Sequence, residues 1–203
     1  MRFEKGHKAE TRKRIVKVAA ARFRKDGVAA VGIAGLMAEA GLTHGGFYAH
    51  FESKEALLRE AMVAAMDTTR ERLNRAAESH GLEGLVRRYL RPSHRDTPED
   101  GCTIASLVAE IARHETATRE VFSARVDTFL LRIAGHLTAL PEAARKQAAI
   151  GILGVMLGTL QLSRAVTDTA LADSVLESGI QAALRLAKPT GLAEPTGLAE
   201  PAQ

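Results

Sequence analysis

The side chains with the clearest chemical potential are basic ones, and they gather near the N-terminus. Residues 1–27 contain ten Lys or Arg and only three acids, which gives this segment a net charge of +7. Because the whole chain carries +4, the remainder carries −3. A basic end on a nearly balanced body predicts one electropositive face for a polyanion, with phosphate contacts that give salt-dependent affinity. The competing interpretation is a solvated helix face with a loose tail.

Enzymatic chemistry is not indicated by any motif. The sequence contains no Gly-x-Ser-x-Gly elbow, no Walker-type phosphate loop and no Rossmann glycine pattern after a strand. Its seven His residues lie far apart, without a pair at i and i+4, so a metal site is not supported either. We therefore expect a protein that is not an enzyme and has no metal or cofactor.

The expected location follows from the single cysteine and from the apolar segments. Cys102 is alone, so the chain cannot form an internal disulfide. The N-terminus lacks the apolar run of about 7 to 15 residues that a signal peptide needs. The longest apolar stretch, residues 148–160, is too short to cross a hydrocarbon layer of ~30 Å. We expect a cytoplasmic protein with no membrane partner.

Apolar residues recur at helical spacing, and strand-like alternation is not convincing anywhere, so the predicted fold class is all-α. Ser53 and Thr43 are plausible N-caps, and Gly27 and Gly41 can end helices. Residues 92–101 are polar and rich in turn formers, which predicts a loop. The predicted helices cover residues 8–25, 33–40, 43–50, 53–79, 82–90, 102–114, 116–140, 141–166 and 171–187.

The second and third predicted helices are short, and a glycine separates them. This arrangement is typical of a helix-turn-helix, in which the first helix crosses the DNA backbone and the second enters the major groove. Residues 41–57, GLTHGGFYAHFESKEAL, sharpen this interpretation because they closely resemble the signature of the TetR family of bacterial transcriptional regulators. The resemblance covers roughly the first sixty residues at the level of motifs and the rest only as a helical layout.

The resemblance implies a three-helix helix-turn-helix domain at residues 1–52 and a helical effector-binding and dimerisation domain at residues 53–188. Such a protein is a homodimer that represses transcription from double-stranded operator DNA and is released by a small-molecule effector. Residues 189–203 contain an exact duplication of PTGLAE, which predicts a flexible tail.

The resemblance also assigns the DNA contacts. Tyr48, His50 and Lys54 match positions that touch the DNA backbone, and all three side chains can donate to phosphate oxygens. Phe47 and Phe51 match buried positions under the reading helix. The positions that match the groove-facing surface are Thr43, His44, Gly45 and Gly46.

This sequence departs from the family pattern where base contacts are expected. Many members begin the second helix with Ser or Thr followed by a base-reading Arg, whereas residues 31–34 here read VGIA. Gly45 and Gly46 offer no side chain, and each costs about 1 kcal/mol of helix propensity relative to Ala. We therefore predict readout by His44, by backbone fit at the glycines, by Ala34 against a thymine methyl, and by the basic arm. Such sparse readout would also suit a non-specific architectural DNA-binding protein, which is the alternative.

Effector contacts are predicted in the second half, although apolar stripes there are more often core than pocket. Polar residues among those stripes are better candidates, since a buried polar group needs a partner and a ligand can be one. The predicted ligand-binding residues are Cys102, Glu110, His114, Phe122, Arg125, Phe129, Gln161 and Arg164.

Cys102 supports a further alternative, a thiol-based electrophile-sensing repressor. A thiol at a helix N-terminus has a lowered pKa and raised reactivity, and some TetR-like electrophile sensors carry Gly-Cys at this point. Against this, Glu99 and Asp100 are adjacent and would raise the pKa of the thiol, and a lone cysteine is usually a small buried hydrophobe.

The dimer interface is predicted from glycine spacing in the helix that starts at Pro141. Gly151, Gly154 and Gly158 fall at i, i+3 and i+7, which lets another helix approach closely. With Val175, Ile180 and Leu184 they would form the four-helix bundle that TetR-like proteins build from their last two helices. The alternative is that the glycines face a helix of the same chain.

Overall fold

The computed structural model describes residues 2–189 and, within them, the side chains from His7 onward. Throughout this range the regular elements are helical and no strand occurs, in agreement with the predicted class. Their order is α1 (Arg2–Asp26), α2 (Ile33–Glu39), η1 (His44–Ala49), α3 (Lys54–Tyr89), α4 (Pro92–Asp96), η2 (Pro98–Asp100), α5 (Thr103–Ile111), α6 (Thr116–Gly135), α7 (Glu142–Ala165) and α8 (Thr169–Leu186).

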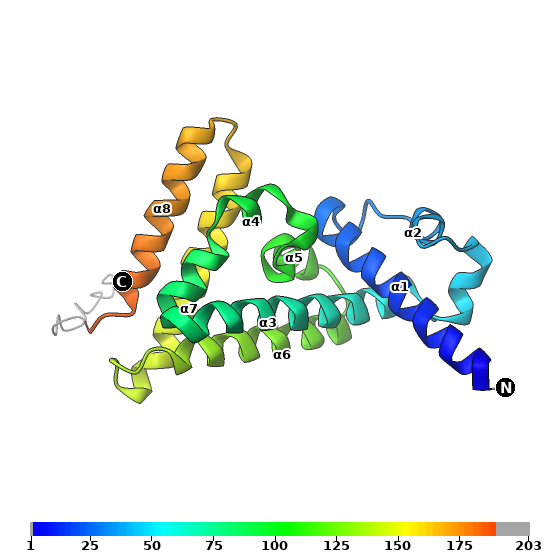
Figure 1. Cartoon of the computed structure of the whole chain (residues 1–203), viewed down its shortest axis with the longest axis horizontal. Coiled ribbons are helices and arrows are strands. Elements are labelled where there is room, and N and C mark those ends of the chain that lie inside the picture. Colours follow the sequence, from blue (N-terminus) through cyan, green and yellow to red (C-terminus); the bar gives the residue numbers. More distant parts are fainter. Residues whose placement is uncertain (1, 190–203) are drawn as a thin grey trace, which may run out of the picture.

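The N-terminal elements lie together at one end of the molecule (Figure 1), and their apolar side chains belong to the one continuous core of the described residues. Phe47 is fully buried, and Phe51 stacks against it with 5.7 Å between the ring centroids. Gly27 and Gly41 have φ values of 81° and 70°, as the turns after α1 and α2 require. The Ser53 hydroxyl accepts a hydrogen bond from the amide of Ala56 at 3.1 Å and caps α3, as predicted.

Helix α3 runs from this end into the body of the molecule, where it packs against α5, α6 and α8 (Figure 1). The two helices predicted over residues 53–79 and 82–90 are both present within α3, joined by a kink at His80 and Gly81, whose backbone angles are not helical. Gly81 has a φ of 56°, a value that glycine adopts readily.

One prediction about secondary structure was wrong, and a second needs a correction of helix type. The third helix, η1, forms at the predicted place but has 3-10 geometry. The segment predicted as a loop contains α4 and η2 instead. It is held by protein contacts, because the Arg164 guanidinium donates to the carbonyls of His94 at 2.8 Å and Arg95 at 3.2 Å.

Helices α7 and α8 form an antiparallel pair at the opposite end from α2 and η1 (Figure 1). Their closest approach uses Gly179, where a Cβ atom would overlap the side chain of Thr159. By length and composition α7 is the one helix in the described range that could cross a membrane, but one side of it is buried in the core. The duplicated hexapeptide lies, from residue 190 onward, outside the described residues.

Candidate DNA interface and effector site

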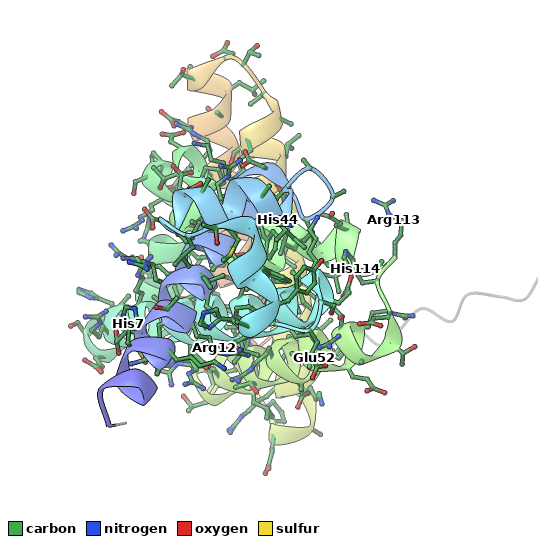
Figure 2. All side chains as sticks on the ribbon, turned by 90° about the vertical axis from the view of Figure 1, so that its right-hand side faces the viewer. His7, Arg12, His44, Glu52, Arg113 and His114 are labelled. Atoms are coloured by element: carbon green, nitrogen blue, oxygen red, sulfur yellow. The ribbon has the colours of Figure 1, made fainter. Side chains whose placement is uncertain are left out.

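The predicted base-reading residues lie on an exposed end of the molecule. Thr43, His44 and Gly45 are exposed and Gly46 is half-buried. Figure 2 faces this end of the molecule and shows His44 on it. Thr43 precedes η1 with an extended backbone, but its hydroxyl makes no capping hydrogen bond, which corrects the predicted N-cap. The position of η1 is therefore held by the packing of Phe47 and not by a side-chain cap.

The start of α2 is equally open. Ala34 is exposed, and Gly32 occupies the N-cap position with φ −86° and ψ 148° but offers no side chain to cap the helix. A Cβ atom on Gly32 would meet nothing within 4 Å. The start of α2, next to η1, therefore has neither a side-chain cap nor the base-reading arginine that many family members have.

The three predicted phosphate contacts differ in their surroundings. Tyr48 is 65% exposed, and its ring meets that of Phe47 edge-on at 5.2 Å. Burial of the ring, with the charges of Lys8 and Arg12, lowers the pKa of His50, so this imidazole is neutral at pH 7 and keeps one N–H donor. Lys54 donates from Nζ to the carbonyl of Val28 at 2.5 Å and has two further N–H groups for phosphate.

Three arginines of α1 pair with other groups of the protein. Arg12 donates from Nε to both carboxylate oxygens of Glu60 at 3.1 Å, and its guanidinium lies 4.1 Å from the centroid of the Phe51 ring. Arg22 pairs with Asp26 at 2.6 Å and also with Glu39, and Arg24 donates to the Glu99 carbonyl at 2.8 Å. The exposed cations of α1 are Lys8, Lys13, Arg14, Lys17 and Lys25. Side chains of the N-terminal arm, Arg2 and Lys5, lie outside the described residues.

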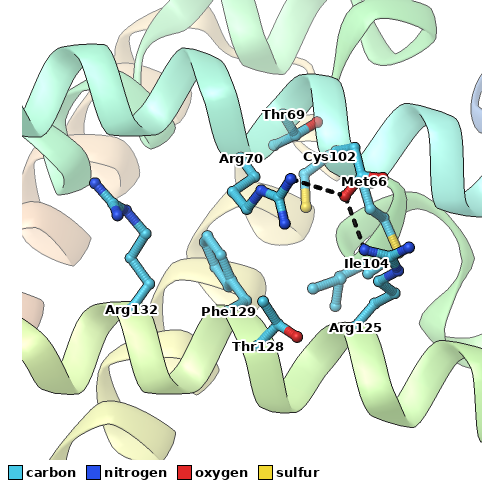
Figure 3. Close-up of a pocket in the computed structure, with 10 residues that line it drawn as sticks. Met66, Thr69, Arg70, Cys102, Ile104, Arg125, Thr128, Phe129 and Arg132 are labelled. Atoms are coloured by element: carbon cyan, nitrogen blue, oxygen red, sulfur yellow. Dashed lines mark hydrogen bonds and ion pairs between the residues drawn. The ribbon is translucent and has the colours of Figure 1, made fainter.

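A cavity lies between α3, α6 and the start of α5, and it brings together Cys102, Arg125 and Phe129 of the predicted ligand-binding residues (Figure 3). Asp67 on α3 accepts from Nη1 of Arg125 at 2.8 Å and pairs with Arg70 at 3.3 Å. The free volume is about 30 Å³, which holds about one water molecule. The remaining lining residues are Met66, Thr69, Ile104, Thr128 and Arg132.

The other five predicted ligand-binding residues do not line this cavity, because protein groups satisfy them elsewhere. Glu110 accepts from the amides of Val28 at 2.8 Å and Ala29 at 2.6 Å. His114 contacts Glu55 through Nδ1 at 2.6 Å. Gln161 donates to the carbonyl of Ala105, Arg164 holds α4, and Phe122 is part of the core.

The cavity residues that the sequence interpretation missed lie on α3 and α6. Arg132 continues a stripe with Arg125, Thr128 and Phe129 at i, i+3, i+4 and i+7, and this spacing could have revealed it. Asp67 gave no such signal, since its partner Arg125 is 58 residues away in sequence.

The comparisons with known proteins agree with this architecture. The bacterial regulatory proteins of the tetR family match residues 15–61, which include α2, η1 and the predicted DNA contacts. Residues 15–61 therefore match the N-terminal DNA-binding region of the TetR family. No curated protein sequence matches it significantly.

Several solved structures resemble nearly the whole chain, among them TetR-family regulators from Cytophaga hutchinsonii and Streptomyces coelicolor. The regulator from Cytophaga hutchinsonii is 19% identical with a TM-score of 0.75, over 88% of this chain and 96% of that one. SCO4454 from Streptomyces coelicolor is 24% identical with a TM-score of 0.69, over 89% and 97%. The reduced form of NemR from E. coli is 17% identical with a TM-score of 0.70, over 87% and 97%. At these identities the likeness shows the fold, and the family match adds DNA-binding transcriptional regulation.

Outside the matched region, Cys102 is 3% exposed and forms part of a buried hydrogen-bond chain. Its amide donates to Nε2 of His94 at 2.9 Å, and Nδ1 of the same ring lies 2.6 Å from the Tyr89 carbonyl. Burial lowers the pKa of His94 to about 4, so the ring is neutral and donates from Nδ1. His94 was predicted to lie in a polar loop, and its role in joining α3 to α5 had no sequence signal.

The predicted interface residues on α7 and α8 fall into two groups. Gly154 and Gly158 are exposed, with open space where a Cβ atom would lie. Val175 and Leu184 are half-buried. In contrast, Ile180 is only 6% exposed and lies in the chain's own core, and a Cβ at Gly151 would lie 3.4 Å from Leu186 of the same chain. Gly151 therefore has the intrachain neighbour that the alternative expects, and little of the Ile180 side chain is accessible to a second copy; the interface stays a prediction.

Proposed function

We propose that this TetR-family chain is a homodimeric repressor that leaves its operator when a small molecule enters the cavity between α3, α5 and α6. The observation that carries the proposal is the position of α5. Cys102 and Ile104, at its start, line the cavity, while Glu110, near its end, accepts from the amides of Val28 and Ala29 in the loop before α2. A nine-residue helix is about 13 Å long and moves as a unit, so a displacement at the cavity reaches the DNA-reading elements.

A second set of contacts supports the same route. His114, in the turn after α5, contacts Glu55 at 2.6 Å, and Thr118 donates to the other oxygen of that carboxylate at 2.7 Å. Arg59 pairs with Glu115 at 2.6 Å. The segment from α5 to α6 therefore touches the loop before α2 and the helix that follows η1, which are the two flanks of the reading unit.

For DNA recognition we assign residues 1–52 as the reading domain and residues 53–188 as the effector and dimerisation domain. His44 is the base reader, with Thr43, Gly45, Gly46 and Ala34 forming the surface around it. Tyr48, His50 and Lys54 are the phosphate contacts. The exposure of His44, Ala34 and Tyr48 supports these roles.

A second copy of the chain is proposed to cover α7 and α8. Ile150, Gly154, Gly158 and Leu162 form one exposed face of α7, and Leu171 extends it on α8. Large exposed apolar residues at regular helical spacing favour a partner helix. We place the dimer in the cytoplasm with its operator.

Operator preference is the decisive measurement. A footprint upstream of the chain's own or a neighbouring gene locates the operator, and fluorescence anisotropy should then show a preference over random DNA of about 10³ or more at physiological salt. A ratio near one would support the architectural alternative instead.

Two matched variants distinguish a contact that recognises the operator sequence from one that contributes to binding of any DNA. His44→Ala should reduce the preference for the operator, because it removes a base contact. Tyr48→Phe, which loses only an exposed hydroxyl, should weaken operator and random DNA alike. Identical effects of the two variants would contradict the assigned roles.

Modification of Cys102 is the second candidate for the inducing signal, favoured by its place in the cavity wall. N-ethylmaleimide should then release the operator from the wild type but not from Cys102→Ser. Equal release from both proteins would exclude it.

A further inference from the structure

We propose that the cavity between α3, α5 and α6 binds an anionic amphiphile, namely a carboxylate carried on a small apolar body. The inference rests on the proposed function, since the ligand is taken to be the effector of that site. Its basis is the charge of the lining. Three guanidinium groups, from Arg70, Arg125 and Arg132, share the wall with a single carboxylate, Asp67.

Asp67 is already occupied by two of these cations. Arg125 donates to it at 2.8 Å and Arg70 pairs with it at 3.3 Å (Figure 3). The Asp67 carboxylate therefore has little capacity to attract a cationic ligand. The net charge of +2 on the lining favours an anion in a partly desolvated site.

Arg132 is the part of the lining that lacks a partner. Its Nε atom is buried and has no hydrogen-bond partner, and within residues 7–189 no carboxylate lies within ion-pair distance of its guanidinium. Figure 3 shows Arg132 on the opposite side of Phe129 from Arg125. A guanidinium has five N–H donors in a planar fork that fits a carboxylate bidentately. A carboxylate ligand would supply the acceptor that the protein leaves out.

The rest of the lining selects the body of the ligand. Met66, Ile104 and Phe129 supply apolar walls beside the arginines. The free volume of about 30 Å³ means that a ligand must displace side chains to enter. The Arg70–Asp67 pair is the element to open, because both side chains are more than 30% exposed and such pairs contribute little to stability.

The test uses three probes of one shape on the full-length protein: phenylacetate, phenylacetamide and 2-phenylethylammonium. Thermal unfolding and isothermal titration should show that phenylacetate binds about tenfold more tightly than phenylacetamide, as one charge-assisted contact predicts. The ammonium compound and inorganic phosphate, which lacks an apolar body, should leave the unfolding midpoint unchanged.

Two variants test whether phenylacetate binds in the cavity. Arg132→Gln should abolish the difference between phenylacetate and phenylacetamide. Arg119→Gln, an exposed arginine on the same helix but outside the cavity, should keep it. The ligand-free unfolding midpoint of each variant shows that both remain folded.

Several outcomes would overturn the inference: equal binding of amide and carboxylate, no binding of phenylacetate, binding of phosphate as tight as that of phenylacetate, or equal loss in both variants. Operator anisotropy in parallel separates this inference from the proposed function. If phenylacetate binds in an Arg132-dependent way while the operator stays bound, effector release fails and the ligand class stands.

Discussion

The DNA-reading end and the regulatory core use polar side chains in opposite ways. On the reading end, His44 and Tyr48 are exposed and make no hydrogen bond to any described residue. In the core, Glu110, His114 and Arg164 are each bonded to backbone or side-chain groups of other elements. Polar groups that the protein leaves unpaired at an accessible site are therefore the better guide to binding, and paired ones usually serve assembly. Arg132, whose Nε atom has no hydrogen-bond partner, is one of several such groups in the regulatory part and the one that lines the cavity.

The prediction with the largest expected effect concerns His94 and tests whether this buried polar group stabilises the fold. His94 has a folded-state pKa of about 4, lowered by burial, against about 6.5 in the unfolded chain. Between these values the unfolded chain binds the proton and the folded chain does not, so stability falls as the pH drops from about 6.5 to about 4, by up to about 3 kcal/mol. Denaturant unfolding across this range measures the slope.

His94→Asn should flatten that slope relative to the wild type. His50 and His136 also have lowered pKa values, but they contribute equally to both proteins, so the difference isolates His94. Parallel slopes would show that the buried hydrogen-bond chain between Tyr89 and Cys102 is not what makes the core sensitive to acid.

The next effect tests the link between the two regions. Glu110→Ala leaves the amides of Val28 and Ala29 without their charged acceptor and should lower the free energy of unfolding by about 2 kcal/mol. It should also weaken operator binding, because the loop before α2 loses its attachment to α5. Denaturant unfolding and anisotropy measure the two effects.

Glu120→Ala is the matched control, since Glu120 is an exposed carboxylate on α6 that makes no ion pair with any described residue. It should change the unfolding free energy by less than about 1 kcal/mol. If Glu110→Ala destabilised the protein without any change in operator affinity, the route through α5 would be excluded.

Local features of this chain were predictable from sequence because they depend on neighbours. The Ser53 cap and the turns at Gly27 and Gly41 follow from residues within one or two turns, whereas the burial of Phe47 was implied by the resemblance to the TetR family. The 3-10 form of η1 was not predicted, although its glycines were recognised, because propensity alone does not decide between α and 3-10 geometry.

Contacts between distant segments were not predictable. The carboxylate of Glu110 lies 82 residues from Val28, and the Arg125–Asp67 pair joins α6 to α3. Periodicity places such residues on a helix face but does not say which helix they meet. The motif residues lie together because they are close in sequence, whereas five of the eight predicted effector contacts lie outside the cavity.

A smaller effect tests whether the two glycines of η1 lower the stability of the protein while allowing DNA to approach the backbone closely. Gly45 and Gly46 both have negative φ, so alanine is allowed at either position and should stabilise the helix by up to about 1 kcal/mol. A methyl group at Gly45 would lie in open space on the exposed surface, whereas at Gly46 it would lie 3.7 Å from Met37 and Thr43. Gly45→Ala should therefore lose operator affinity, and Gly46→Ala should lose less. Equal affinities in anisotropy would contradict readout by close backbone approach at Gly45.

The smallest effect concerns the bare start of α2, where the reading end lacks a contact that core helices such as α8 possess. The Asp168 side chain caps α8 by accepting from the amides of Ala170 and Leu171, whereas Gly32 caps nothing. Gly32→Ser places a hydroxyl in open space with an extended backbone suited to an N-cap, and should raise the free energy of unfolding by a few tenths of a kcal/mol. Gly32→Ala adds a carbon without an acceptor and should lower it instead, since alanine is a poor N-cap. Opposite signs in denaturant unfolding would show that capping, and not mere loss of a glycine, is what α2 lacks.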